Sequence, residues 1–213
     1  MYKLEKIKLL PARERVGSAL RKAIISGEFK SGEVLVLEDI ADRLGVSITP
    51  VREAFQMLDA EGLIELSHNK GAIVQGMSRE DISDHYELRG ILESAAIRLA
   101  CERSEKLDDL IEIHNSSLEA KSKGDINKYS DLNQSFHMEI WELSKNKKLV
   151  STLSNLWNGL SASNAISESQ YAEISFSEHE NILNAMIKGN VNLAEELMRN
   201  HISRSEKTMT NHY

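Results

Sequence analysis

Apolar residues recur at helical spacing near the start of the chain. Val16, Leu20 and Ile24 lie four residues apart and share one face of a helix. Pro11 precedes them and Gly27 follows, and these residue types favour the first turn and the end of a helix. The spacing therefore predicts an amphipathic helix over residues 11–27.

Short elements of two kinds follow, as far as Gly76. The run EDIADRLG predicts a short helix that ends at Gly45, and Ser47 is expected to cap a further helix that ends at Gly62. Strand-forming runs predict strands at 34–37, 63–66 and 72–75, the last two joined by the polar turn SHNKG. The order helix, strand, helix, turn, helix, hairpin is typical of a winged helix-turn-helix.

The pattern changes after Gly76, where only helical spacing remains. Ser78 and Asp81 match a capping box at the start of a long helix. The apolar stripe of this helix is expected to be Leu88, Leu92, Ala95 and Leu99, and further helices are expected to start near Ser104, Asp125, Asn146, Glu173 and Asn190. We therefore predict a mainly α protein, with a winged helix-turn-helix domain over residues 1–76 and an all-α antiparallel helical bundle of about six helices over residues 77–213.

Charge is divided unevenly between these two expected domains. Residues 1–76 carry 11 Lys and Arg against 11 Asp and Glu, whereas residues 77–213 carry 15 against 22 and hold the whole net charge of −7. An acidic surface repels phosphates, so contact with nucleic acid is expected only in the first domain.

Three features of the sequence bear on its location. No stretch approaches the roughly 18 consecutive apolar residues of a membrane span, and the N-terminus lacks the long apolar segment of a secretory signal. A single cysteine, Cys101, excludes an internal disulfide framework and fits a reducing compartment. We therefore expect a cytoplasmic protein with no membrane partner.

The run 37–66 carries the most informative pattern. Ser47, Thr49 and Pro50 begin its second helix, and free amides with hydroxyls at a helix N-terminus suit a phosphate oxygen. Arg52, one turn further, is placed to reach a guanine edge with two hydrogen bonds. The alternative is a capped helix with no further role, because short motifs often match by chance. The order of the surrounding elements favours the interpretation that this helix binds DNA.

Lys70, at the tip of the expected hairpin, is a second candidate for contact with the DNA backbone or an adjacent minor groove. One recognition helix per chain reads few base pairs. We therefore expect a homodimer that binds a palindromic operator in double-stranded DNA.

Three of the seven histidines lie on apolar stripes of three different expected helices. They are His137, His179 and His201, and Asn133 lies one turn before His137. Three imidazoles and one oxygen donor suit a divalent transition metal such as zinc, nickel or manganese. A lone histidine on an apolar face is more often a hydrogen-bonded core residue, but three together require three buried partners.

The pattern L-x-D-I-A-x-x-L-G-V-S-x-T-P-V-R-E-A-x-x-x-L-x-x-E-G-L-I, followed by a K-G wing, resembles the GntR family of bacterial transcription regulators. The helical second half is similar to the FadR-type branch, whose ligand-binding domain is called FCD. The resemblance covers about Leu10 to His201. It matches the family at Ser47, Thr49, Arg52 and the wing residue Gly71. The family often has arginine where this chain has Ile48, so one of its common base contacts is missing here.

The resemblance also implies a metal and an effector. FCD domains commonly carry an acid or amide four residues before an F-H pair, then an E-H pair, then a late histidine. These positions are Asn133, His137, His179 and His201. The metal of the family helps to hold a carboxylate effector, and Arg89 in YELRGILE matches a family arginine. A guanidinium suits a carboxylate, but a simple helix pair between Arg89 and Glu93 is the alternative.

We predict a ligand-responsive, sequence-specific DNA-binding transcription regulator, a repressor controlled by a small carboxylate bound near a metal. One alternative is a metal-dependent hydrolase built on the histidines, and another is a DNA-binding module whose helical domain only dimerises. A hydrolase needs a general base near its metal, whereas Glu178 and Glu180 are expected to point off the helical face of His179. We therefore expect no enzyme. The remaining predictions are that His68, His114 and His212 are solvated and that Trp141 and Trp157 lie in the core.

Overall fold

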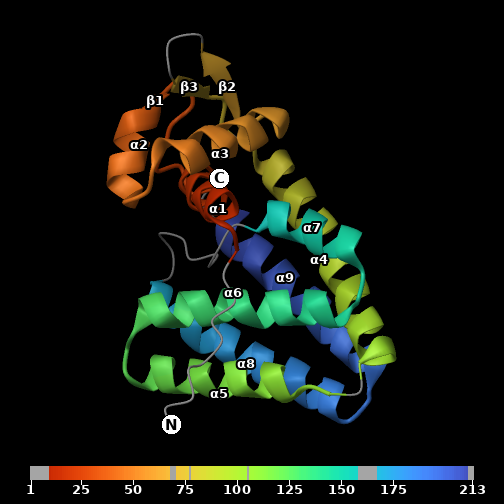
Figure 1. The fold of residues 1–213 in the computed structure, drawn as a ribbon. Coiled ribbons are helices and arrows are strands. Elements are labelled where there is room, and N and C mark those ends of the chain that lie inside the picture. The colour runs from red at the N-terminus through yellow and green to blue at the C-terminus, as the bar shows by residue number, and fades with distance from the viewer. Residues whose placement is uncertain (1–9, 68–70, 77, 105, 158–166, 211–213) are drawn as a thin grey trace.

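Two structural units follow one another along the chain (Figure 1). The computed structural model describes residues 10–67, 71–76, 78–104, 106–157 and 167–210. The first unit contains α1 (Ala12–Ile25), β1 (Val34–Val36), α2 (Leu37–Leu44), α3 (Ile48–Ala60), β2 (Ile64–Ser67) and β3 (Gly71–Val74). The second contains α4 (Arg79–Arg103), α5 (Asp108–Ser122), α6 (Ile126–Leu143), α7 (Lys147–Leu156), α8 (Glu168–Ile187) and α9 (Val191–Thr210). The mainly α fold with a winged helix-turn-helix and an all-helical second part is confirmed.

The first unit is held together by one apolar core. Leu20, Ile24, Val51, Phe55 and Leu58 are almost fully buried between α1 and α3. The three strands lie in the order β1-β3-β2, and both pairs are antiparallel.

The turn between α2 and α3 determines how the recognition helix leaves the domain. Gly45 has φ 63° at the end of α2, a conformation that costs glycine little, and this turn is as predicted. The predicted strand at 34–37 is one residue too long, because Leu37 already begins α2.

The second unit is a bundle in which α4 packs along α9 and α5 packs along α6. The Ser78–Asp81 capping box is present, with Ser78 Oγ accepting from the Asp81 amide at 3.1 Å. The start predicted for α8 at Glu173 is wrong, because Ser167 and Gln170 form an earlier capping box.

The predicted apolar stripe of α4 is only partly correct: Leu92 and Leu99 are half-buried against the cluster around Trp141. Leu88 is 46% exposed, and the buried face instead runs through Ile82, Tyr86 and Ile97. Arg89 and Glu93 share this buried face, so polar residues interrupt the periodicity by which a core face is recognised.

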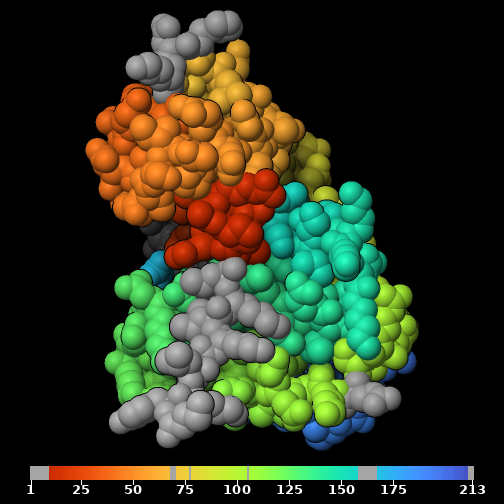
Figure 2. Space-filling view, in the orientation of Figure 1, coloured from red at the N-terminus to blue at the C-terminus, as the bar shows by residue number. Residues whose placement is uncertain are grey.

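The helix α1 lies against α7 and connects the two units (Figure 2). A small cluster of Leu10, Trp141, Leu149, Leu153 and Trp157 fills the space beside α4 and α7. None of the helices in the described parts of the chain has the length and apolar character that a membrane crossing requires.

Candidate metal centre and recognition face

His137 of α6, His179 of α8 and His201 of α9 meet in the core of the bundle. All three are buried, and one ring nitrogen of each lies within 4.8 Å of the others. The Nε2 atoms of His137 and His201 are 3.3 Å apart. The structure thus brings together the three histidines that the sequence singles out; their role as ligands stays a prediction.

Two carboxylates orient these imidazoles from behind. Glu93 Oε2 lies 3.2 Å from His137 Nδ1, and Glu178 Oε2 lies 2.6 Å from His201 Nδ1. When each Nδ1–H donates a hydrogen bond to its carboxylate, the Nε2 atom of each ring carries a lone pair, and these two lone pairs face each other. Carboxylate–histidine pairs of this kind fix ring orientation in metal sites.

The centre has the properties of a cation site. Two facing lone pairs repel each other unless a proton or a metal cation lies between them, and His179 Nε2 is buried with no hydrogen-bond partner among the described residues. Two nitrogens bound at 2.0–2.1 Å to a tetrahedral ion lie about 3.3–3.4 Å apart, which matches the separation of the His137 and His201 Nε2 atoms. These residues therefore fit a divalent transition metal.

Burial keeps the histidines in the form that a metal requires. It lowers the pKa of His201 to about 4, although the adjacent Glu178 partly offsets the shift. Burial and the neighbouring His201 and His137 lower the pKa of His179 well below its usual value. Both rings are neutral at pH 7, so no proton has to leave them before they bind a metal.

The supporting carboxylates stay charged. Burial alone would raise the pKa of Glu93, but its interaction and hydrogen bond with His137, the Arg89 charge and a 2.7 Å hydrogen bond from Trp141 outweigh burial and hold this pKa at about 2. Glu178 likewise has a pKa of about 2, because hydrogen bonds from His201 and Arg204 outweigh the effect of burial.

Arg89 and Asn133 lie in buried polar surroundings. The Arg89 Nε donates to Glu93 Oε1 at 3.2 Å, and its guanidinium lies 4.6 Å from the ring centre of Trp157. The ion pair between Arg89 and Glu93 within one helix, which the sequence offers as the alternative to an effector site, is therefore present. Asn133 Oδ1 accepts from Ser175 Oγ at 3.2 Å. The effector role of Arg89 and the ligand role of Asn133 stay predictions.

The recognition helix α3 presents the predicted polar residues. Ser47, Thr49 and Arg52 are exposed and Pro50 is partly exposed at its first turns. Ser47 is the N-cap residue of α3 as predicted, but the expected capping hydrogen bond from its side chain is absent, so its hydroxyl is not used by the helix.

The wing residues differ from this pattern. Lys70 lies outside the described residues. Gly71 is buried, and a Cβ there would lie 2.4 Å from the Leu35 carbonyl oxygen. Its missing side chain thus lets β3 approach β1, and its contact with DNA stays a prediction.

The gntR family of bacterial regulatory proteins matches residues 12–74, and the FCD domain matches residues 84–204. The chain belongs to the GntR family, in its FCD-containing branch. The family named from the sequence is thereby confirmed. The two matches lie on either side of the domain boundary expected after Gly76.

Relatives of known name agree with this assignment. The chain is 33% identical over 134 residues to the Nta operon transcriptional regulator of Aminobacter aminovorans, covering 62% of this chain and 63% of that protein. It is 28% identical over 205 residues to the probable D-xylose utilization operon transcriptional repressor of Paenarthrobacter nicotinovorans, covering 90% and 87%. E. coli McbR/YncC has the same fold, with a TM-score of 0.73, 22% identity and coverage of 96% and 100%. These proteins are regulators rather than enzymes.

The sequence pattern does not predict every residue around the histidine cluster. Glu178, expected to point off the helical face of His179, lies beside the cluster, because its carboxylate contacts His201 Nδ1 of the next helix, α9, at 2.6 Å. His114, predicted to be solvated, is buried and stacked on Phe176 at 4.5 Å, so that prediction is wrong. Trp141 and Trp157 lie in the core as predicted, whereas His68 and His212 lie outside the described residues.

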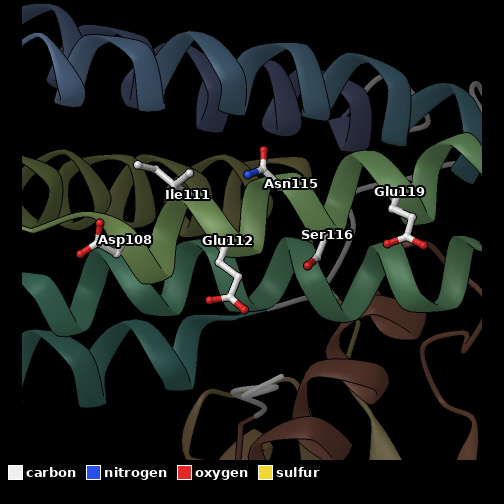
Figure 3. Close-up of a pocket in the computed structure, with 6 residues that line it drawn as sticks. All are labelled: Asp108, Ile111, Glu112, Asn115, Ser116 and Glu119. Carbon is white, nitrogen blue, oxygen red and sulfur yellow. The ribbon is translucent and has the colours of Figure 1, made fainter. Parts of the chain in front are cut away.

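A separate surface pocket lies on α5 (Figure 3). It is lined by Asp108, Ile111, Glu112, Asn115, Ser116 and Glu119. Its acidic lining contains none of the clustered histidines, and no other feature of the described residues indicates a ligand there.

Proposed function

We propose that this protein is a sequence-specific DNA-binding transcription regulator whose helical domain binds a divalent metal and a small carboxylate. His137, His179 and His201 hold the metal. The observation that supports this most directly is the set of three buried imidazoles with two Nε2 atoms 3.3 Å apart and a third Nε2 without a partner among the described residues. Zinc, nickel and manganese are the candidate ions.

The carboxylate effector binds beside the metal, and Arg89 recognises it. A bound metal supplies a fixed positive charge that attracts the carboxylate. Arg89 is already paired with Glu93, so an incoming carboxylate competes with Glu93 for this guanidinium. Asn133, whose amide oxygen now accepts from Ser175, serves as a further oxygen ligand.

The first domain, residues 1–76, binds DNA, and the second, residues 77–213, binds the ligands and forms a homodimer. Ser47, Thr49 and Pro50 place the start of α3 on a phosphate, and Arg52 reads a base edge. Lys70 and Gly71 place the wing on the DNA backbone. Two-fold symmetry of the dimer requires a palindromic operator.

We propose repression as the sign of regulation. The relative from Paenarthrobacter nicotinovorans is named as a repressor and aligns over 90% of this chain. A reporter gene placed behind an operator selected by the protein from random DNA tests the sign. Expression that rises when the regulator gene is deleted supports repression, and expression that falls contradicts it.

The experiment for the ligand site is thermal melting with added Zn²⁺, Ni²⁺ or Mn²⁺, followed by small dicarboxylates. We expect the metal to raise the melting temperature of the wild type, because it ties three helices together in the folded state. The variant His137→Ala/His179→Ala loses this rise. His114→Ala, which alters a buried histidine outside the cluster, keeps it. An equal rise in all three proteins would contradict the assigned ligands.

A further inference from the structure

Arg21 of α1 joins three parts of the molecule through one guanidinium. Its Nε and Nη2 donate to the Glu61 carboxylate at 2.9 and 2.6 Å, and its Nη1 donates to the Trp157 carbonyl oxygen at 2.7 Å. Glu61 is the C-cap of the recognition helix α3, and Trp157 is the C-cap of α7. The side chain of Arg21 is only 1% exposed.

Trp157 faces the candidate metal centre with its ring while its main chain holds Arg21. The ring lies 5.1 Å from that of His137 and 4.6 Å from the Arg89 guanidinium, centre to centre. A residue in the wall of the ligand site is thus two hydrogen-bonded steps from the end of α3.

His85 of α4 lies near the Arg21 guanidinium that joins Glu61 and Trp157. Its Nε2 is buried without a hydrogen-bond partner among the described residues. Burial, and then the charges of Arg21 and Arg89, lower the pKa of His85 to about 3. The imidazole therefore lies within the electrostatic reach of both arginines.

A second interaction between the two units is an exposed ion pair rather than a buried one. Lys22 pairs with Glu168 at 2.8 Å, and both side chains are substantially exposed to solvent. An exposed pair adds little, whereas a buried arginine requires partners that satisfy its charge and is strongly sensitive to their movement. In Figure 2 the helix α1, which carries Arg21 and Lys22, lies between the rest of the first unit and α7.

We propose that Arg21 is the positioning residue that couples occupancy of the metal centre to the placement of α3. The inference rests on the proposed function. A metal bound by His137, His179 and His201 fixes the position of the His137 ring, against which Trp157 packs, relative to His179. A shift of the Trp157 carbonyl then moves Arg21, and the two hydrogen bonds to Glu61 carry the movement to the end of the recognition helix.

The test is the ratio of DNA affinities with and without saturating Zn²⁺, measured on a duplex that the wild-type protein selects from random sequence. We expect a ratio that differs from one by about fivefold or more in the wild type, within the usual range of allosteric coupling. In Arg21→Met, which keeps an apolar stem but no guanidinium, we expect a ratio close to one. Competition with a chromophoric chelator should show unchanged Zn²⁺ affinity in this variant, apart from the reciprocal effect of DNA.

Lys22→Met is the matched control, because it removes the exposed tie from the next residue of the same helix. It should keep the wild-type ratio. If Arg21→Met does not fold, Glu61→Gln breaks the ionic half of the connection at a partly exposed side chain and should reduce the ratio.

The outcomes separate the inference from the proposed function. A wild-type ratio retained in Arg21→Met, or in Glu61→Gln where only that variant folds, would overturn the role of Arg21 and leave the metal site standing. A wild-type ratio of one with zinc bound would overturn the coupling as well. Failure of the wild type to bind zinc would overturn the metal site itself, and with it this inference.

Discussion

The two cores of the molecule are built on different principles. In the described part of the winged unit the buried polar and charged residues are Glu14, Ser18 and Arg21, all on α1. The helical bundle instead buries three clustered histidines with the charged residues Arg89 and Glu93 among them. Buried polar and charged groups cost stability unless they are fully paired, so we expect the clustered histidines to make the second core less stable than an apolar core of the same size.

We expect the largest change in stability from a substitution that disrupts the apolar core of the first unit. Phe55→Ala should lower the free energy of unfolding by about 3–5 kcal/mol, because it removes a fully buried ring between α1 and α3. Urea denaturation of the metal-free protein measures the change. A loss below about 1 kcal/mol would show that this core is not packed as described.

A smaller effect is expected at the recognition face, which contributes no core. Arg52→Ala should weaken binding to the selected operator by about 1–3 kcal/mol and relax base preference at one position. Lys70→Ala serves as the contrast and should weaken binding to all sequences similarly while reducing its salt dependence. Equal losses on operator and random DNA for Arg52→Ala would show that this residue grips only phosphate.

An apolar substitution in the histidine cluster should raise the stability of the metal-free protein, whereas the substitution in the apolar core lowers it. His179→Phe replaces a buried imidazole, whose Nε2 lacks a partner among the described residues, by an apolar ring stacked beside Phe136. We expect the metal-free protein to gain about 1 kcal/mol of stability in urea denaturation, since an unsatisfied buried polar atom is removed. Metal binding is lost at the same time. Destabilisation comparable with that of Phe55→Ala would contradict the distinction between the two cores.

A further prediction concerns pH. The pKa of His85 falls from 6.5 to about 3 on folding, so the folded state binds fewer protons than the unfolded state. Its contribution to stability is therefore complete above pH 6.5 and is lost progressively as the pH falls towards 3. Metal-free His85→Gln should lose less stability than the wild type between pH 7 and about pH 5. Identical losses in the two proteins would exclude His85 as a source of the pH dependence.

Sequence patterns predicted the winged unit better than the bundle. The turn at Gly45 and the start of α3 at Ser47 depend on neighbouring residues, so the chain displays them locally. The buried face of α4 was misassigned because Arg89 and Glu93 lie on it, and their partners come from elsewhere in the chain.

In the candidate site, too, the sequence predicts features that are set within one helix and misses those that depend on contacts between helices. The three histidines were found because each lies on an apolar stripe of its own helix. Glu178 and His201 are 23 residues apart on different helices, and the stacking of His114 on Phe176 joins α5 to α8. Only the packing of helices creates these pairs, and no local spacing indicates them.

The measurement that tests the central claim most directly is the metal content of protein purified from cells without chelator. We expect about one divalent transition-metal ion per chain in the wild type and in His114→Ala. We expect none in His137→Ala/His179→Ala. Wild-type protein that contains no metal, and that takes up no Zn²⁺, Ni²⁺ or Mn²⁺ on dialysis, would contradict the assignment of these histidines as a metal centre.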